Sequence, residues 1–75
     1  MTNVKKVSDA AFRLAWAEKT LVERIYRNGE ASDEVAKDMH MTTSEARMRL
    51  GRAFRKISDM TGIDDEIVEE LVCFI

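Results

Sequence analysis

The sequence predicts an all-α fold in a single domain that spans residues 1–75. Three observations carry this prediction: apolar residues recur at helical spacing, proline is absent, and little of the chain alternates apolar and polar residues as a strand would. A domain of 75 residues buries only about 60% of the surface of its unfolded chain. We therefore expect every helix to contribute to one small core.

Residues 1–7 show no clear periodicity, and we expect them to form a flexible arm. Ser8 is a candidate N-cap for the helical stretch that follows. The pattern allows either one helix of about twenty residues or two helices with a break near residues 19–20. Gly29 is expected to end this stretch, because glycine is favoured just past a helix C-terminus.

Three aromatic residues, Phe12, Trp16 and Tyr26, fall at helical spacing in this stretch. Such side chains can stack on nucleic-acid bases, but at this spacing they more often belong to a core. We therefore expect them to be buried.

A short helix is predicted to begin at Ser32, which can cap a first turn that holds two acidic residues. Val35, Ala36 and Met39 form its apolar edge, and the small Ala36 would let a second helix cross closely. A turn through His40 follows.

The second helix of this pair begins with a capping box, in which Thr42 and Glu45 can satisfy each other's backbone N–H groups. At about 100° per residue, one stripe of this helix is apolar and is expected to face the core. It comprises Ala46, Leu50, Ala53 and Ile57, with Phe54 at its edge. The pattern therefore predicts a helix-turn-helix over residues 32–57. In such motifs the second helix enters the DNA major groove.

The opposite face of this second helix is the candidate DNA site. Residues 44–57 carry five basic side chains against one acidic side chain, a net charge of +4. Basic side chains would neutralise phosphates, and Arg52 suits guanine at a base edge. We expect the DNA contacts at Thr43, Ser44, Arg47, Met48, Arg49, Arg52, Arg55 and Lys56.

A final helix is predicted over residues 64–75, after Gly62 ends the preceding helix. Residues 58–75 hold six acidic side chains and no basic one, so DNA would repel this segment. It must lie away from the phosphate-facing side or compete with DNA for the arginines. Its apolar end is a candidate contact for a partner protein or for a homodimer, through Leu71, Val72, Phe74 and Ile75.

From Glu34 to Ile57 the chain resembles region 4 of sigma factors, their promoter-reading C-terminal domain, especially in the extracytoplasmic-function branch. The resemblance rests on Glu34-Val35-Ala36 and on the run ARxRLxRAxRKI that ends at Ile57. It extends upstream to Leu21 and covers about half of the chain. His40 stands where the family usually has glycine, and no counterpart of the promoter-melting part is present, so we do not expect a complete sigma factor. The resemblance implies a tri-helical helix-turn-helix core to which the acidic C-terminal helix is added.

Two functions follow as hypotheses. The first is a small transcription regulator that binds double-stranded DNA through its recognition helix. The alternative is a phage- or plasmid-type factor that binds RNA polymerase or a sigma factor with a region 4-like fold. The net charge of −2 favours the alternative, because free-standing DNA binders are usually basic.

Other classes of protein are less compatible with the sequence. We expect neither an enzyme nor a cofactor or metal site, because the chain lacks a Gly-rich phosphate loop, a metal-ligand cluster and a nucleophile paired with a base. The N-terminus lacks the apolar core of a signal peptide, and a single cysteine excludes an internal disulfide. With no membrane-spanning apolar run, these features predict a cytoplasmic protein.

Overall fold

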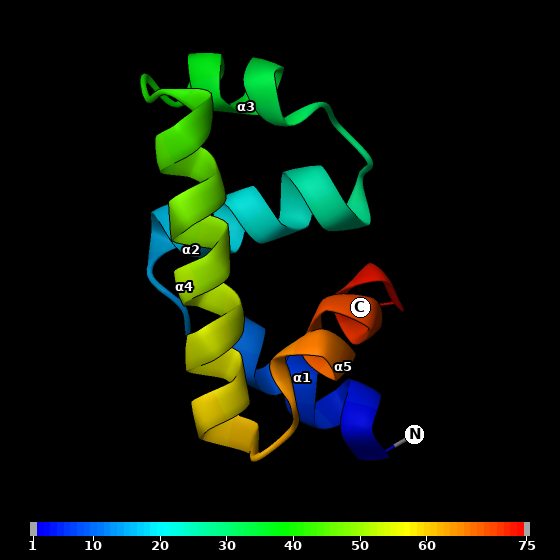
Figure 1. Cartoon of the computed structure of the whole chain (residues 1–75). Helices are drawn as coiled ribbons and strands as arrows, with labels where there is room; N and C mark the ends of the chain where they lie inside the picture. Colours follow the sequence, from blue (N-terminus) through cyan, green and yellow to red (C-terminus); the bar gives the residue numbers. More distant parts are fainter. Residues whose placement is uncertain (1, 75) are drawn as a thin grey trace.

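A long helix, α4, runs the length of the molecule, and shorter helices pack along it (Figure 1). The computed structural model describes residues 2–74, which are all-helical and contain no strand. α3 crosses one end of α4, whereas α1 and α5 lie at the other end (Figure 1). The elements in chain order are α1 (Thr2–Phe12), α2 (Trp16–Leu21), η1 (Val22–Arg27), α3 (Ser32–Asp38), α4 (Thr43–Thr61), α5 (Asp65–Leu71) and η2 (Val72–Phe74).

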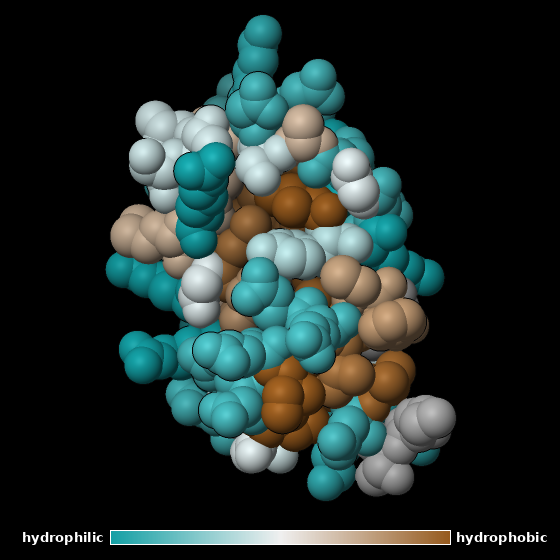
Figure 2. Space-filling model, turned by 45° about the vertical axis from the view of Figure 1, so that its right-hand side comes forward, coloured by the Kyte–Doolittle hydropathy of each residue, from teal (hydrophilic) through white to brown (hydrophobic). Residues whose placement is uncertain are grey.

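One apolar core joins all of these elements. Its largest fully buried side chains come from α1, α2, α3, α4, α5 and η2, and they are Val7, Leu21, Val35, Ile57, Val68 and Val72. Apolar surface also remains among the hydrophilic side chains on the face drawn in Figure 2. None of the helices in residues 2–74 has both the length and the apolar composition needed to cross a bilayer.

The N-terminal segment is a helix, so the expectation of a flexible arm over residues 1–7 is wrong for the described residues 2–7. These residues form the first part of α1, and Ser8 lies inside that helix instead of capping one. Val7, Ala10 and Leu14 are buried because their spacing turns them to one side, where α4, α5 and η2 pack against α1.

The helix is interrupted at residues 13–15, earlier than the predicted break near 19–20. This interruption changes the exposure of two aromatic side chains. Phe12 is 76% exposed and Trp16 is 73% exposed, so the expectation that they are buried is wrong. Because α1 ends at Phe12, the two side chains no longer share one helical stripe. Tyr26 is half-buried, as expected of a core residue, and packs edge-on against Phe54 with ring centroids 5.0 Å apart.

α2 passes directly into η1, a stretch of wider π-helical turns that ends before Gly29. The backbone N–H of Asn28 donates to the carbonyl of Glu23 at 2.9 Å, five residues earlier. Gly29 adopts a positive φ of 71°, which glycine tolerates without a steric penalty. This confirms that glycine ends the stretch.

α3 starts at Ser32 itself, so the predicted cap is displaced by one residue: Ala31 occupies the N-cap position and has no side-chain oxygen to offer. At the other end, the N–H of Met41 donates to the carbonyl of Ala36 at 2.9 Å, and that of His40 donates to Lys37 at 3.1 Å. This is the Schellman pattern of helix termination, which requires a left-handed residue. His40 supplies it with φ of 58°, where glycine is normally preferred.

α4 follows the predicted apolar pattern, but only the Thr42 half of the predicted capping box forms. The side-chain oxygen of Thr42 accepts a hydrogen bond from the N–H of Glu45 at 3.1 Å, while the Glu45 carboxylate pairs with Arg49. Gly62 ends the helix with φ of 74°. The predicted core stripe is confirmed, since all five of its side chains are buried: Ala46, Leu50, Ala53, Phe54 and Ile57.

The C-terminal segment is helical, as predicted, and two of its valines form its buried side. Val68 and Val72 are fully buried, whereas Ile67 is 44% exposed. Val72 therefore belongs to the core and cannot serve as an exposed partner contact. Leu71 packs partly against the core, Phe74 is 76% exposed, and Ile75 lies outside the described residues.

Candidate nucleic-acid interface

The outward surface of α4 gathers most of the predicted site residues. We call the exposed side chains along it the α4 face: Ser44, Arg47, Met48, Gly51, Arg52 and Arg55. They share this surface because the apolar stripe of the same helix is held in the core. Thr43 and Arg49 lie at its edge and are half-buried.

Three arginines of the α4 face have no acidic partner. Within residues 2–74, Arg47, Arg52 and Arg55 have no carboxylate within salt-bridge distance. Arg47 and Arg55 are eight positions apart, which corresponds to about 12 Å along a helix. Their guanidinium groups are therefore free to donate hydrogen bonds to an anionic ligand.

The other two basic residues predicted on this surface are already engaged. Arg49 pairs with Glu45 one turn earlier, at 3.3 Å. The Lys56 amine donates to the carboxylate of Glu18 at 2.9 Å, and that side chain is only 9% exposed. Lys56 therefore neutralises a buried carboxylate on α2, and its use as a DNA contact stays a prediction that requires this pair to open.

A second polar cluster fixes the position of α3. Arg24, on η1, contacts the carboxylate of Glu30 at 2.7 Å and that of Asp38 at 2.9 Å. The hydrogen bond from Arg24 lowers the pKa of Glu30, and the two acceptors raise the pKa of Arg24. This hub ties η1 to both ends of α3, and so holds the helix that packs against the start of α4.

Sequence patterns did not identify this hub. Its members are separated by 6 and 14 residues, and they are brought together only by the loop around Gly29 and the packing of α3. The only part of this cluster that the local sequence indicates is the turn at Gly29, where a positive φ is expected. A glycine marks a change of chain direction but does not say which charges then meet.

η1 also contacts the C-terminal helix through Tyr26. Its hydroxyl donates to the Glu69 carboxylate at 3.2 Å. Burial raises the pKa of Tyr26, and the negative charge of Glu69 raises it further. The remaining carboxylates of residues 58–74 are exposed: Asp59, Asp64, Asp65, Glu66 and Glu70.

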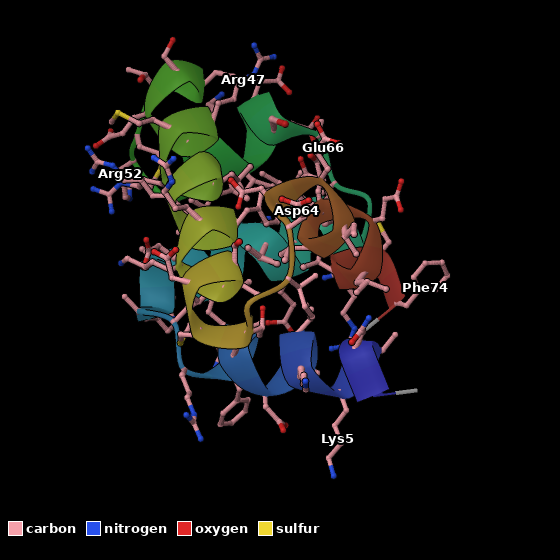
Figure 3. The ribbon with its side chains drawn as sticks, turned by 60° about the horizontal axis from the view of Figure 1, so that its bottom comes forward. Lys5, Arg47, Arg52, Asp64, Glu66 and Phe74 are labelled. Carbon is pink, nitrogen blue, oxygen red and sulfur yellow. The ribbon has the colours of Figure 1, made fainter. Side chains whose placement is uncertain are left out.

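The acidic and basic surfaces of the chain do not meet. Figure 3 shows Arg52 projecting from α4 on the side opposite Asp64. No carboxylate of α5 forms an ion pair with an α4 arginine among the described residues.

Gly51 lies near the middle of the α4 face, and a Cβ atom built there would meet no other atom within 4 Å. Crowding by another helix of this chain therefore does not explain the glycine. What the glycine provides is open space beside the arginines, where a ligand could approach the backbone.

Residues 2–74 contain no group of three His, Cys, Asp or Glu side chains arranged to hold a metal ion. Comparisons with protein-family models, curated protein sequences and solved structures give no match to this chain. The function of the α4 face is therefore inferred from its geometry and charge alone.

Proposed function

We propose that the chain is a small transcription regulator in which α3 and α4 act as a helix-turn-helix and α4 enters the major groove of double-stranded DNA. The observation that carries the proposal is the set of three unpaired arginines on the exposed α4 face. A major groove about 12 Å wide admits a helix, and arginines along that helix can reach phosphates on both sides.

The proposed roles follow from position along the helix. Arg47 and Arg55, at the two ends of the row, neutralise phosphates, which supply much of the affinity but little of the specificity. Arg52, Met48 and Ser44 lie between or before them and meet base edges, with Arg52 suited to guanine. Gly51 supports a close contact between DNA and the backbone of α4, because it presents no side chain.

The test is a titration of fluorescent duplex DNA with the wild-type chain and with Arg52→Ala or Arg55→Ala. Each substitution should weaken binding about tenfold and make the affinity less dependent on salt, because one charged contact is lost. Lys5→Ala is the matched control, since Lys5 is an exposed basic residue on α1, remote from Arg52 (Figure 3). Equal affinity of wild type and both α4 variants, with folding verified by circular dichroism, would reject the proposal.

A second candidate function is binding to RNA polymerase or to a sigma factor. It is favoured by Phe74, which is 76% exposed at the end of η2, because an exposed aromatic suits a protein contact. Pull-down from a bacterial lysate should recover polymerase or sigma subunits, and Phe74→Ser should reduce their recovery. Two results count against this candidate. The wild type could recover neither polymerase nor sigma subunits, or Phe74→Ser could recover them as well as the wild type does.

A further inference from the structure

Two exposed helical surfaces of opposite charge cannot meet within one copy of this chain. The first is the α4 face, with its three unpaired arginines. The second we call the α5 face, and it comprises Glu66, Ile67 and Glu70, with Asp64 at the preceding N-cap. Because α4 and α5 pack against the same core, their exposed surfaces point in different directions (Figure 3).

The two faces complement each other in more than charge. Each has an exposed apolar side chain among its charges: Met48 on the α4 face is 51% exposed, and Ile67 on the α5 face is 44% exposed. Such an arrangement, an apolar centre with a charged rim, is typical of protein interfaces. Gly51 leaves open space beside Met48, so that a second helix could lie close to α4.

The lengths of the two faces also agree. The α4 face covers residues 44–55, or about 17 Å of helix, and the α5 face covers residues 64–70, or about 9 Å. The shorter acidic face therefore fits within the longer basic one. A formal net charge of only −2 offers little long-range repulsion between two copies.

We propose that the α4 face of one copy binds the α5 face of a second copy, head to tail. Carboxylates of the second copy then occupy the positions around the arginines, and Ile67 packs against Met48. The contact is heterologous, so a chain of copies has one free α4 face at one end and one free α5 face at the other, and it can keep growing. Because the ion pairs are exposed, the association should weaken as salt is added.

This contact has a regulatory consequence that rests on the proposed DNA-binding function: DNA and the second copy would compete for the same arginines. The self-association itself does not depend on DNA. The two ideas are therefore tested separately, the first by sedimentation of protein alone and the second by adding duplex DNA to the same samples.

The experiment uses two neutralised variants of the full chain. One removes charge from the α4 face, Arg52→Ser with Arg55→Ser, and the other removes it from the α5 face, Glu66→Ser with Glu70→Ser. In low salt, the wild type should form larger species as its concentration rises, and each variant alone should remain largely monomeric. In an equimolar mixture, each variant supplies the face that the other lacks, so a 1:1 dimer should form and should not grow further.

Matched controls remove charge elsewhere on the surface. Lys5→Ser with Lys6→Ser removes two positive charges, and Asp9→Ser with Glu34→Ser removes two negative ones, all at exposed positions. Both controls should associate as the wild type does. Circular dichroism establishes that every variant is folded before it is compared.

Three results would overturn the proposal: a wild type that stays monomeric in low salt, a mixture of the two variants that does not dimerise, or a wild type that stops at a dimer. The last result would indicate a symmetric contact. If the mixture dimerises while duplex DNA binds neither the wild type nor any variant, the self-association stands and the DNA-binding function falls. If DNA binds but the mixture stays monomeric, the reverse holds.

Discussion

The two ends of α4 are held by different kinds of contact. At the end near α1 and α5, fully buried Val7, Ile57 and Val68 belong to the core (Figure 1). At the end near α3, Val35 is also fully buried beside the smaller Ala36 and Ala46, and an ion-pair cluster around Arg24 holds α3 in addition.

This difference indicates that apolar burial and polar contacts contribute differently at the two ends of α4. Burial of large apolar side chains supplies most of the stability, at about 25 cal/mol per Å² of apolar surface. Polar contacts are individually weaker but directional, so they suit the orientation of α3 against α4. The apolar end should therefore dominate the free energy of unfolding, and the polar end should respond to pH.

The largest expected effect is at the apolar end. Ile57→Ala should lower the free energy of unfolding by about 2–5 kcal/mol, because it leaves a cavity among fully buried side chains. Chemical denaturation measures the loss. Met60→Ala, on the same helix but 48% exposed, is the control and should change stability by less than about 0.5 kcal/mol. Similar losses for the two variants would show that burial does not set the energetic cost at this end of α4.

The ion pair between α2 and α4 should rank second. Lys56→Met leaves the buried Glu18 carboxylate without its partner and should cost about 1–3 kcal/mol, since the ammonium itself is half-exposed. Adding Glu18→Gln should recover part of the loss, because the buried charge is then gone. A double variant that is as unstable as the sum of the two single variants would show that they do not interact.

The cap of α4 tests the end near α3. Thr42→Ala removes the acceptor for the N–H of Glu45 and should cost about 1 kcal/mol. Thr42→Ser keeps the hydroxyl and should retain most of the stability. Thermal unfolding of the three proteins separates loss of the cap from a general effect of substitution; a Ser variant as unstable as the Ala variant would rule out the cap.

The smallest effect, and the one that separates the two ends most sharply, concerns pH. Arg24 lowers the pKa of Glu30 in the folded chain, so this carboxylate stabilises the fold above its unfolded pKa of about 4.3. That stability is lost as pH falls through the lower folded pKa. Glu30→Gln should therefore be less stable than wild type at neutral pH and equal to it in strong acid, whereas the deficit of Ile57→Ala should persist.

Local patterns predicted α4 well but did not predict the exposure of the N-terminal aromatics. The stripe of α4 repeats over about three turns, and Gly62 follows the helix, so neither depends on distant contacts. In and just after α1, by contrast, the informative spacing was that of Val7, Ala10, Ala11 and Leu14, which are the side chains that become buried. Phe12 and Trp16 drew attention because they are large, although the break at residues 13–15 removes them from that stripe.

The candidate site was predicted only as far as exposure and charge. Periodicity placed Arg47, Arg52 and Arg55 outside the core, and the structure agrees. It could not reveal that Lys56 faces Glu18, because the two residues are 38 positions apart and meet only when α2 packs on α4. Ion pairs between distant segments follow from the fold, and helical spacing within one segment carries no information about them.

Gly51 lowers the stability of α4 at the centre of the α4 face. Glycine within a helix lowers stability by about 1 kcal/mol relative to alanine, and here no neighbouring atom would obstruct the extra methyl group. A domain of this size has little stability to spare. The chain thus tolerates a weakness that a single methyl group would repair, at the centre of the surface where a second molecule is proposed to bind. Selection for function, at the expense of robustness, is the pattern expected of such a position.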